Sequence, residues 1–175
     1  MAHPTRPHLL SLRDWWALGE DQGGHVELQE GVRVVAPRPS PAHARTVLGL
    51  ARQLADQLPD GVEVLVEVDV VVDPSTPATV RVPDLICRLA TDDDSMITAD
   101  QVILAVEVVS PGSRRTDRVT KSSEYADAGI PHYWIVHEDR TVTTLRLMAG
   151  GYEASVHVGD FATQLPWPLR ITTSY

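Results

Sequence analysis

The residues best suited to chemistry are two acids that interrupt apolar runs and a lysine that follows them. Glu107 interrupts the apolar run AVEVV, and Asp84 follows a proline in RVPDLIC. A carboxylate among strand valines is costly to bury unless it is paired or binds a metal ion. Two such carboxylates could hold Mg²⁺, with water molecules completing the octahedron.

The lysine, Lys121, would complete a set suited to phosphate chemistry. A metal ion held by Asp84 and Glu107 would stabilise charge on a phosphoryl group and help to generate hydroxide. Lys121 would orient the water or stabilise the pentacovalent oxyanion. This set fits phosphodiester hydrolysis better than acyl transfer, and the sequence contains nothing that resembles a nucleophile elbow or a P-loop.

Each of these residues also has a plainer interpretation. Glu107 could lie at a sheet edge or be neutralised by a basic neighbour. Asp84 could be a turn residue after proline, at a strand end or a bulge. Lys121 could form a surface pair with Asp117, which stands four residues before it on the same helix face. The chemical interpretation requires Lys121 to lie near Glu107, and the Ser-Pro-Gly break between them could direct the helix back over the strand.

Sequence patterns predict the elements that would position these side chains. A capping box at Ser11 predicts a short helix, the segment HVELQEGVRVVAP predicts a hairpin turning near Gly31, and Ser40-Pro41 opens a longer helix. Between Val62 and Val72 every even position is valine, which predicts one strand with a single buried face. The segment RVPDLICRL predicts a further short strand.

The candidate residues fall on the elements that follow. Residues 102–109 predict a central strand covered on both faces, because they are almost continuously apolar. Residues 116–128 predict a helix that ends at Gly129. A strand at 132–137 and a hairpin turning at Gly150-Gly151 come next. The order predicts an α/β or α+β domain with a mixed central β-sheet flanked by helices.

Composition limits the class of protein. The chain has 175 residues, which predicts a single domain over 1–175. No apolar run approaches the ~20 residues of a membrane helix. Cys87 is the only cysteine and no Cys/His cluster has zinc spacing, so a cytoplasmic location is expected. The net charge of −9 argues mildly against a protein that coats nucleic acid.

The motifs around the candidate site resemble those of a known family. PD at 83–84, EVVSP at 107–111 and DRVTKSSEYADAGIPHYWIV at 117–136 are similar to the Uma-two family, described as putative restriction endonucleases, in the PD-(D/E)XK nuclease superfamily. The segment VELQEGVRVVAPRPSPAH at 26–43 resembles the family's glutamate-then-glycine hairpin leading to a histidine. The resemblance covers roughly residues 12–160. It implies a restriction-endonuclease-like core.

The resemblance also implies roles for individual residues. Asp84 and Glu107 match the two acidic positions of the motif, whereas Val109 occupies the place of the usual strand lysine. Lys121 matches a lysine on the following helix that substitutes for it. Glu27 matches an upstream glutamate that would join the metal shell, and an exposed hairpin acid is an equally open interpretation of this residue.

Three further residues are candidates for supporting roles. His43 matches the family histidine in the first turn of its helix. It could contact phosphate or the metal site, or simply occupy a helix N-terminus. Asp117 and Tyr125 are interpreted as supports for Lys121.

The function implied by the resemblance is a Mg²⁺- or Mn²⁺-dependent DNA endonuclease. Asp84, Glu107 and Glu27 would bind the metal, and water would attack a phosphodiester in line with Lys121 at the scissile phosphate. The alternative is a non-catalytic module of the same fold that binds nucleic acid or a protein partner, which the acidic charge favours. Cutting both strands generally calls for two active sites, so a homodimer is a consequence of the nuclease hypothesis.

Overall fold

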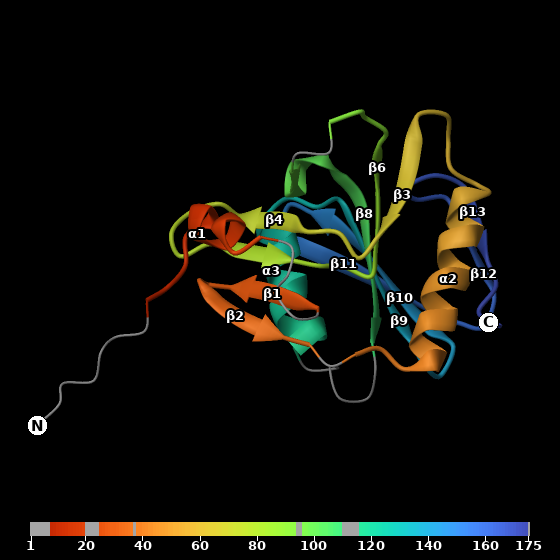
Figure 1. Ribbon diagram of the computed structural model, residues 1–175. Coiled ribbons are helices and arrows are strands. Elements are labelled where there is room, and N and C mark those ends of the chain that lie inside the picture. The colour runs from red at the N-terminus through yellow and green to blue at the C-terminus, as the bar shows by residue number, and fades with distance from the viewer. Residues whose placement is uncertain (1–7, 20–24, 37, 94–95, 110–115, 175) are drawn as a thin grey trace, which may run out of the picture.

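Two large β-sheets, a two-stranded sheet and short helices form the described part of the protein (Figure 1). The computed structural model describes residues 8–19, 25–36, 38–93, 96–109 and 116–174, and the side chains of 116–118 fall outside this description. The helical elements are α1 (Leu12–Ala17), α2 (Pro41–Ala55), the 3₁₀ turn η1 (Ala99–Gln101), the π-helical segment η2 (Thr116–Lys121) and α3 (Ser122–Asp127). No described helix has the length and apolar character needed to cross a membrane.

The strands form a mixed arrangement. They are β1 (Val26–Gln29), β2 (Val32–Val35), β3 (Val62–Val66), β4 (Val70–Asp73), β5 (Thr79–Arg81), β6 (Leu85–Leu89), β7 (Ile97–Thr98), β8 (Val102–Val109), β9 (His132–His137), β10 (Thr141–Met148), β11 (Gly151–Val158), β12 (Phe161–Thr163) and β13 (Leu169–Ile171). One sheet has the order β11-β10-β9-β8-β6-β3, and the second has the order β2-β1-β5-β4-β7. The pairs β8–β9 and β4–β7 are parallel and the others are antiparallel, so the predicted α+β class with a mixed sheet is confirmed.

Helix starts and turns follow their local residues. At α1, the Ser11 side chain accepts a hydrogen bond from the Asp14 backbone and Asp14 accepts one in return, which is the predicted capping box. At α2, Ser40 accepts from the backbone of His43. The predicted hairpin is β1–β2, and Gly31 at its turn has φ +76°, a conformation that suits glycine.

The predicted long strand from Val62 to Val72 is wrong. It is divided into β3, in the six-stranded sheet, and β4, in the five-stranded sheet. The division falls at Glu67, whose φ is +50°, and the chain changes sheets there. The valine alternation does not mark the break, because Val62 and Val64 pack against one buried cluster and Val70 and Val72 pack in another.

The single strand predicted for RVPDLICRL is also divided. Arg81 ends β5 in one sheet and Leu85 begins β6 in the other, with Val82, Pro83 and Asp84 between them. Pro83 has no N–H to donate to a strand ladder, which favours a break at this point. Asp84 consequently lies at the junction of the two sheets.

Strand β8 separates two buried clusters in the six-stranded sheet. Val106 and Val108 pack in one cluster with α2 and β13. Ala105 and Val109 pack in the other with Tyr125 of α3. Alternation along the strand therefore places Glu107 on the face that α3 covers, among side chains excluded from water.

Candidate active site

The ladder between β6 and β8 brings the two predicted acids together. The strands are antiparallel with Leu85 opposite Val106, so Asp84 and Glu107 are the next residues along the same ladder. The backbone N–H of Val108 donates to Oδ2 of Asp84 at 2.6 Å. Asp84 is 7% exposed and Glu107 is 6% exposed. A sheet-edge position for Glu107 is therefore wrong, since β8 is central and the side chain is buried.

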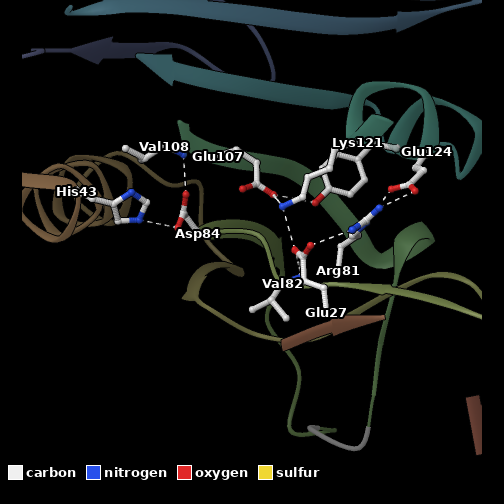
Figure 2. Close-up of polar contacts among 10 residues, drawn as sticks. Glu27, His43, Arg81, Val82, Asp84, Glu107, Val108, Lys121 and Glu124 are labelled. Carbon is white, nitrogen blue, oxygen red and sulfur yellow. Dashed lines mark hydrogen bonds and ion pairs between the residues drawn. The ribbon is translucent and has the colours of Figure 1, made fainter. Parts of the chain in front are cut away.

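The first turn of α2 brings His43 to the same point. Its Nε2 lies 2.9 Å from Oδ1 of Asp84 (Figure 2). The hydrogen bond to Asp84 raises the pKa of His43 above its ordinary value, although partial burial of the ring acts in the opposite direction. His43 is thus more than a residue at a helix N-terminus, because it holds one oxygen of Asp84 while Val108 holds the other.

Lys121 lies at Glu107, as expected from the order of the elements. Its Nζ is 2.8 Å from Oε1 of Glu107 and 2.9 Å from Oε1 of Glu27. Lys121 is only 5% exposed, so the interpretation as half of a surface pair is wrong. The side chain of Asp117 and the Ser-Pro-Gly break lie outside the described residues.

Tyr125, predicted to support the lysine, contacts the lysine's partner. Its hydroxyl donates to Oε1 of Glu107 at 3.1 Å. Burial raises the pKa of Tyr125 well above its ordinary value, and the neighbouring Glu107 adds to this rise. The phenol therefore remains a hydrogen-bond donor throughout the physiological pH range.

Glu27 lies inside the site. It is 7% exposed, so the interpretation as an exposed hairpin acid is wrong. Besides Lys121, it accepts from Nη1 of Arg81 at 2.9 Å and from the backbone N–H of Val82 at 3.1 Å. Burial would raise the pKa of Glu27, but the charges of Lys121 and Arg81 outweigh burial and lower it. Glu27 is thus ionised and surrounded by donors.

Arg81 and Glu124 belong to this cluster and were missed in the sequence. Arg81 donates to Glu124 through Nε and Nη2, both at 2.7 Å, in a two-pronged contact (Figure 2). The sequence offers a signal for Glu124 alone. Glu124 stands three residues after Lys121 and so shares its helix face. Arg81 has no such signal, because it becomes the cross-strand neighbour of Glu27 only through the β1–β5 ladder, in which Leu28 pairs with Val80.

The pKa values of the two glutamates that contact Lys121 are shifted in opposite directions. Burial raises the pKa of Glu107 to about 8, although Lys121 opposes the shift. The carboxylates of Asp84 and Glu27 add to the rise. Lys121 therefore lies between Glu107, whose ionised form is disfavoured by burial, and Glu27, whose ionised form is favoured by its donors. The 2.8 Å contact between Lys121 and Glu107 offsets part of the cost of burying that carboxylate.

Asp84 and Glu107 have the donor atoms and the charge to hold a divalent cation. Oxygen donors suit Mg²⁺ and Mn²⁺, and Oε2 of Glu107 accepts no hydrogen bond from the described part of the chain. A cation would also offset the burial and the neighbouring carboxylates that raise the pKa of Glu107. Across the described ranges, no three Asp, Glu, His or Cys side chains gather as a metal-binding group. Glu27, which was also predicted to bind the metal, contacts the cationic side chains of Arg81 and Lys121. The residues fit a cation held by two carboxylates, with water completing its shell.

Comparisons with known proteins identify the family of this chain and its fold. A family model described as "Uma2: Putative restriction endonuclease" matches residues 10–170. Among solved structures, the chain is similar to one described as a putative nuclease belonging to DUF820 from Anabaena variabilis, with a TM-score of 0.72 and 16% identity. That match covers 94% of this chain and 95% of the other, and it confirms the predicted fold. No significant match was found among curated proteins. Because the family model spans most of the sequence, the chain belongs to the Uma2 family.

Proposed function

We propose that the protein is a Mg²⁺- or Mn²⁺-dependent endonuclease that hydrolyses phosphodiester bonds of DNA. The observation that carries this proposal is the convergence of Asp84, Glu107 and Lys121 at one end of the β6–β8 ladder. Glu107 lies on β8, Lys121 on η2 and Asp84 between β5 and β6, and all three side chains are buried. Such a set of two acids and a lysine has a direct use in phosphate chemistry and little use in stabilising a core.

Asp84 and Glu107 are the residues that would hold the cation. A bound Mg²⁺ would supply charge stabilisation for the phosphoryl oxygens and a water molecule of lowered pKa. His43 and the Val108 backbone fix the carboxylate of Asp84, and Tyr125 helps to fix that of Glu107. Contacts of this kind orient metal ligands and are needed for tight binding.

Lys121 would serve the phosphate. Hydrolysis forms a bond between a water oxygen and phosphorus and breaks the P–O bond on the opposite side, and the leaving oxygen takes up a proton. Negative charge grows on the phosphoryl oxygens as this occurs, and the ammonium group of Lys121 would stabilise it. Glu27 would contribute by holding Lys121 from the side opposite Glu107, a role its contacts with Arg81 and Val82 support.

A non-catalytic binding module is the second candidate, and the net charge of −9 favours it. Nucleic-acid binding usually relies on a basic surface, so the acidic charge favours a module that binds a protein partner over one that binds DNA. The buried Lys121 between two glutamates argues for the enzyme, because a binding surface has no need of it. We include a homodimer in the enzyme proposal, because two subunits would supply one active site for each of the two DNA strands.

Cleavage of supercoiled plasmid tests the proposal. Wild-type protein with Mg²⁺ or Mn²⁺ should nick or linearise the plasmid, and Glu107→Gln and Lys121→Ala should each lose most of this activity. Val156→Thr, at an exposed position of β11, is the matched control and should cleave normally. Equal cleavage by all variants would reveal a contaminating nuclease and refute the mechanism. Absence of cleavage by any of them would favour the binding module.

A further inference from the structure

Arg81 occupies the centre of the buried charge cluster without contacting the proposed metal ligands. It is 1% exposed, and among the described residues its hydrogen bonds go to Glu27 and Glu124. The guanidinium thus links β1, which carries Glu27, to α3, which carries Glu124. The substrate and the cation would both lie on the other side of Lys121 and Glu27.

The contacts close into a ring that contains Lys121. Arg81 binds Glu27, Glu27 binds Lys121, and the helical segment connects Lys121 to Glu124, which returns to Arg81. Lys121 and Glu124 are three residues apart, so they project from the same side of the segment. Docking this segment through Glu124 therefore also sets the place of the lysine ammonium.

The ring matters because Lys121 comes from a helix. A side chain on a central strand is placed by the sheet ladder, whereas one on a helix depends on how that helix is docked. The planar fork of arginine fixes direction as well as distance, which a lysine at position 81 would not do. Buried ion networks of this kind contribute little net stability compared with apolar packing, so stability alone is a weak reason for the network.

We propose that Arg81 and Glu124 are positioning residues that hold the ammonium of Lys121 in place through Glu27 and through the docking of α3. The catalytic consequence of this role rests on the proposed nuclease function, but the placement of Lys121 can be measured without any activity. Lys121 is the only lysine in the 175-residue chain, so a lysine label reports on this side chain alone.

NMR of protein labelled with ¹³Cε-lysine measures that placement directly. In the wild type, an immobilised Lys121 should show two distinct ε-methylene proton shifts and slow internal motion. In Arg81→Gln the two shifts should merge and the order parameter of the ε-carbon should fall. Glu124→Gln, which keeps a neutral partner for Arg81 and changes a side chain that is 19% exposed, should show the same change to a smaller extent.

Arg88→Gln is the matched control. Arg88 is also buried, at 2% exposure, and donates to Glu63 at 2.8 Å in the β3–β6 pair. Its loss should lower stability and leave the Lys121 signals as in the wild type. If Arg81→Gln does not fold, Glu124→Gln decides the question. Unchanged Lys121 signals in the folded variants of the ring would overturn the proposal, whether or not any variant cleaves DNA.

Kinetics supply the second readout. Arg81→Lys keeps the charge but removes the fork, and kcat should fall roughly 10–100-fold with KM unchanged, because displacement of a catalytic group mainly affects the chemical step. In a Lys121→Ala background, Arg81→Lys should cause no further loss. A full second loss in that background would overturn the proposal. Absence of cleavage by the wild type would refute the nuclease function alone, and the lysine signals would still decide whether Arg81 positions Lys121.

Discussion

The Nζ atom of Lys121 lies 2.8 Å from Oε1 of Glu107, although 14 positions separate the two residues and they belong to different elements. Glu107 is on the central strand β8, and Lys121 is at the junction of η2 and α3. The contact lies on the buried face that α3 covers, where the Tyr125 hydroxyl is a second donor to Glu107. In the proposed mechanism, catalysis at this site depends on the size and orientation of the Lys121 ammonium group.

Lys121→Arg should be nearly as inactive as Lys121→Ala, despite the retained charge. The ammonium fits between two buried carboxylates, and the larger planar guanidinium cannot take the same position. Loss of a charge-stabilising donor costs roughly 10²–10³-fold in kcat. Plasmid-cleavage rates at saturating Mg²⁺ measure the effect. Arg13→Lys, an exchange at an exposed position of α1, should cleave like the wild type, and normal activity of Lys121→Arg would contradict the assigned role.

Mg²⁺ should raise the melting temperature of the wild type, because a cation at Asp84 and Glu107 binds only the folded chain. At ten times the Kd the gain is about 1.4 kcal/mol. This corresponds to roughly 3–6 °C for a chain of this size. Differential scanning fluorimetry with and without Mg²⁺ or Mn²⁺ measures the shift. Asp84→Asn should abolish it, and Glu153→Gln, at an exposed position of β11, should not. An equal shift in Asp84→Asn would place the cation elsewhere.

His43→Ala should weaken the response to Mg²⁺ without abolishing cleavage at saturation. His43 holds one oxygen of Asp84, and loss of a group that orients a metal ligand typically costs 10–100-fold in metal affinity. The measurement is the Mg²⁺ concentration that gives half-maximal cleavage. Thr46→Ala, three residues further along α2, serves as control since its hydroxyl bonds only within the helix among the described residues. If this concentration is the same in His43→Ala and in the wild type, His43 does not help to bind the metal ion and is only a residue of the first turn of α2.

The parts of this site that local patterns predicted are those within one element. Glu107 on a central strand follows from the apolar run around it, and the Lys121 helix follows from its cap at Gly129. The expected proximity of Glu107 and Lys121 needed only the order of these two consecutive elements. These predictions needed only the residue periodicity within each element and the order of consecutive elements along the chain.

The rest depended on long-range pairing that one sequence does not display. Arg81 and Glu27 are 54 residues apart, and they meet only because β1 pairs with β5 in a second sheet. That sheet exists because the chain turns at Glu67, where the valine alternation shows no break. The spacing of Glu124 from Lys121 places both on one helix face, but a polar stripe is the same in sequence whether water or a buried arginine faces it.

Acidification should destabilise the fold through His132. Burial lowers the pKa of His132, and the neighbouring Arg146 adds to the effect. An unfolded histidine titrates near 6.5, so just below that pH the unfolded chain binds more protons than the folded chain and stability falls. His43, whose pKa is raised, acts in the opposite direction, and the test must therefore compare variants.

His132→Gln should reduce the loss of melting temperature between pH 7.5 and pH 5.5, because it removes the group that must remain unprotonated in the fold. Thermal melts at several pH values in metal-free buffer measure this difference. His8→Gln is the control, since the His8 side chain is 81% exposed and is in contact with water in the folded chain as well as in the unfolded chain. If the melting temperatures of His132→Gln and of the wild type fall equally on acidification, the fold does not depend on the neutral form of His132. The acid sensitivity then arises from other groups.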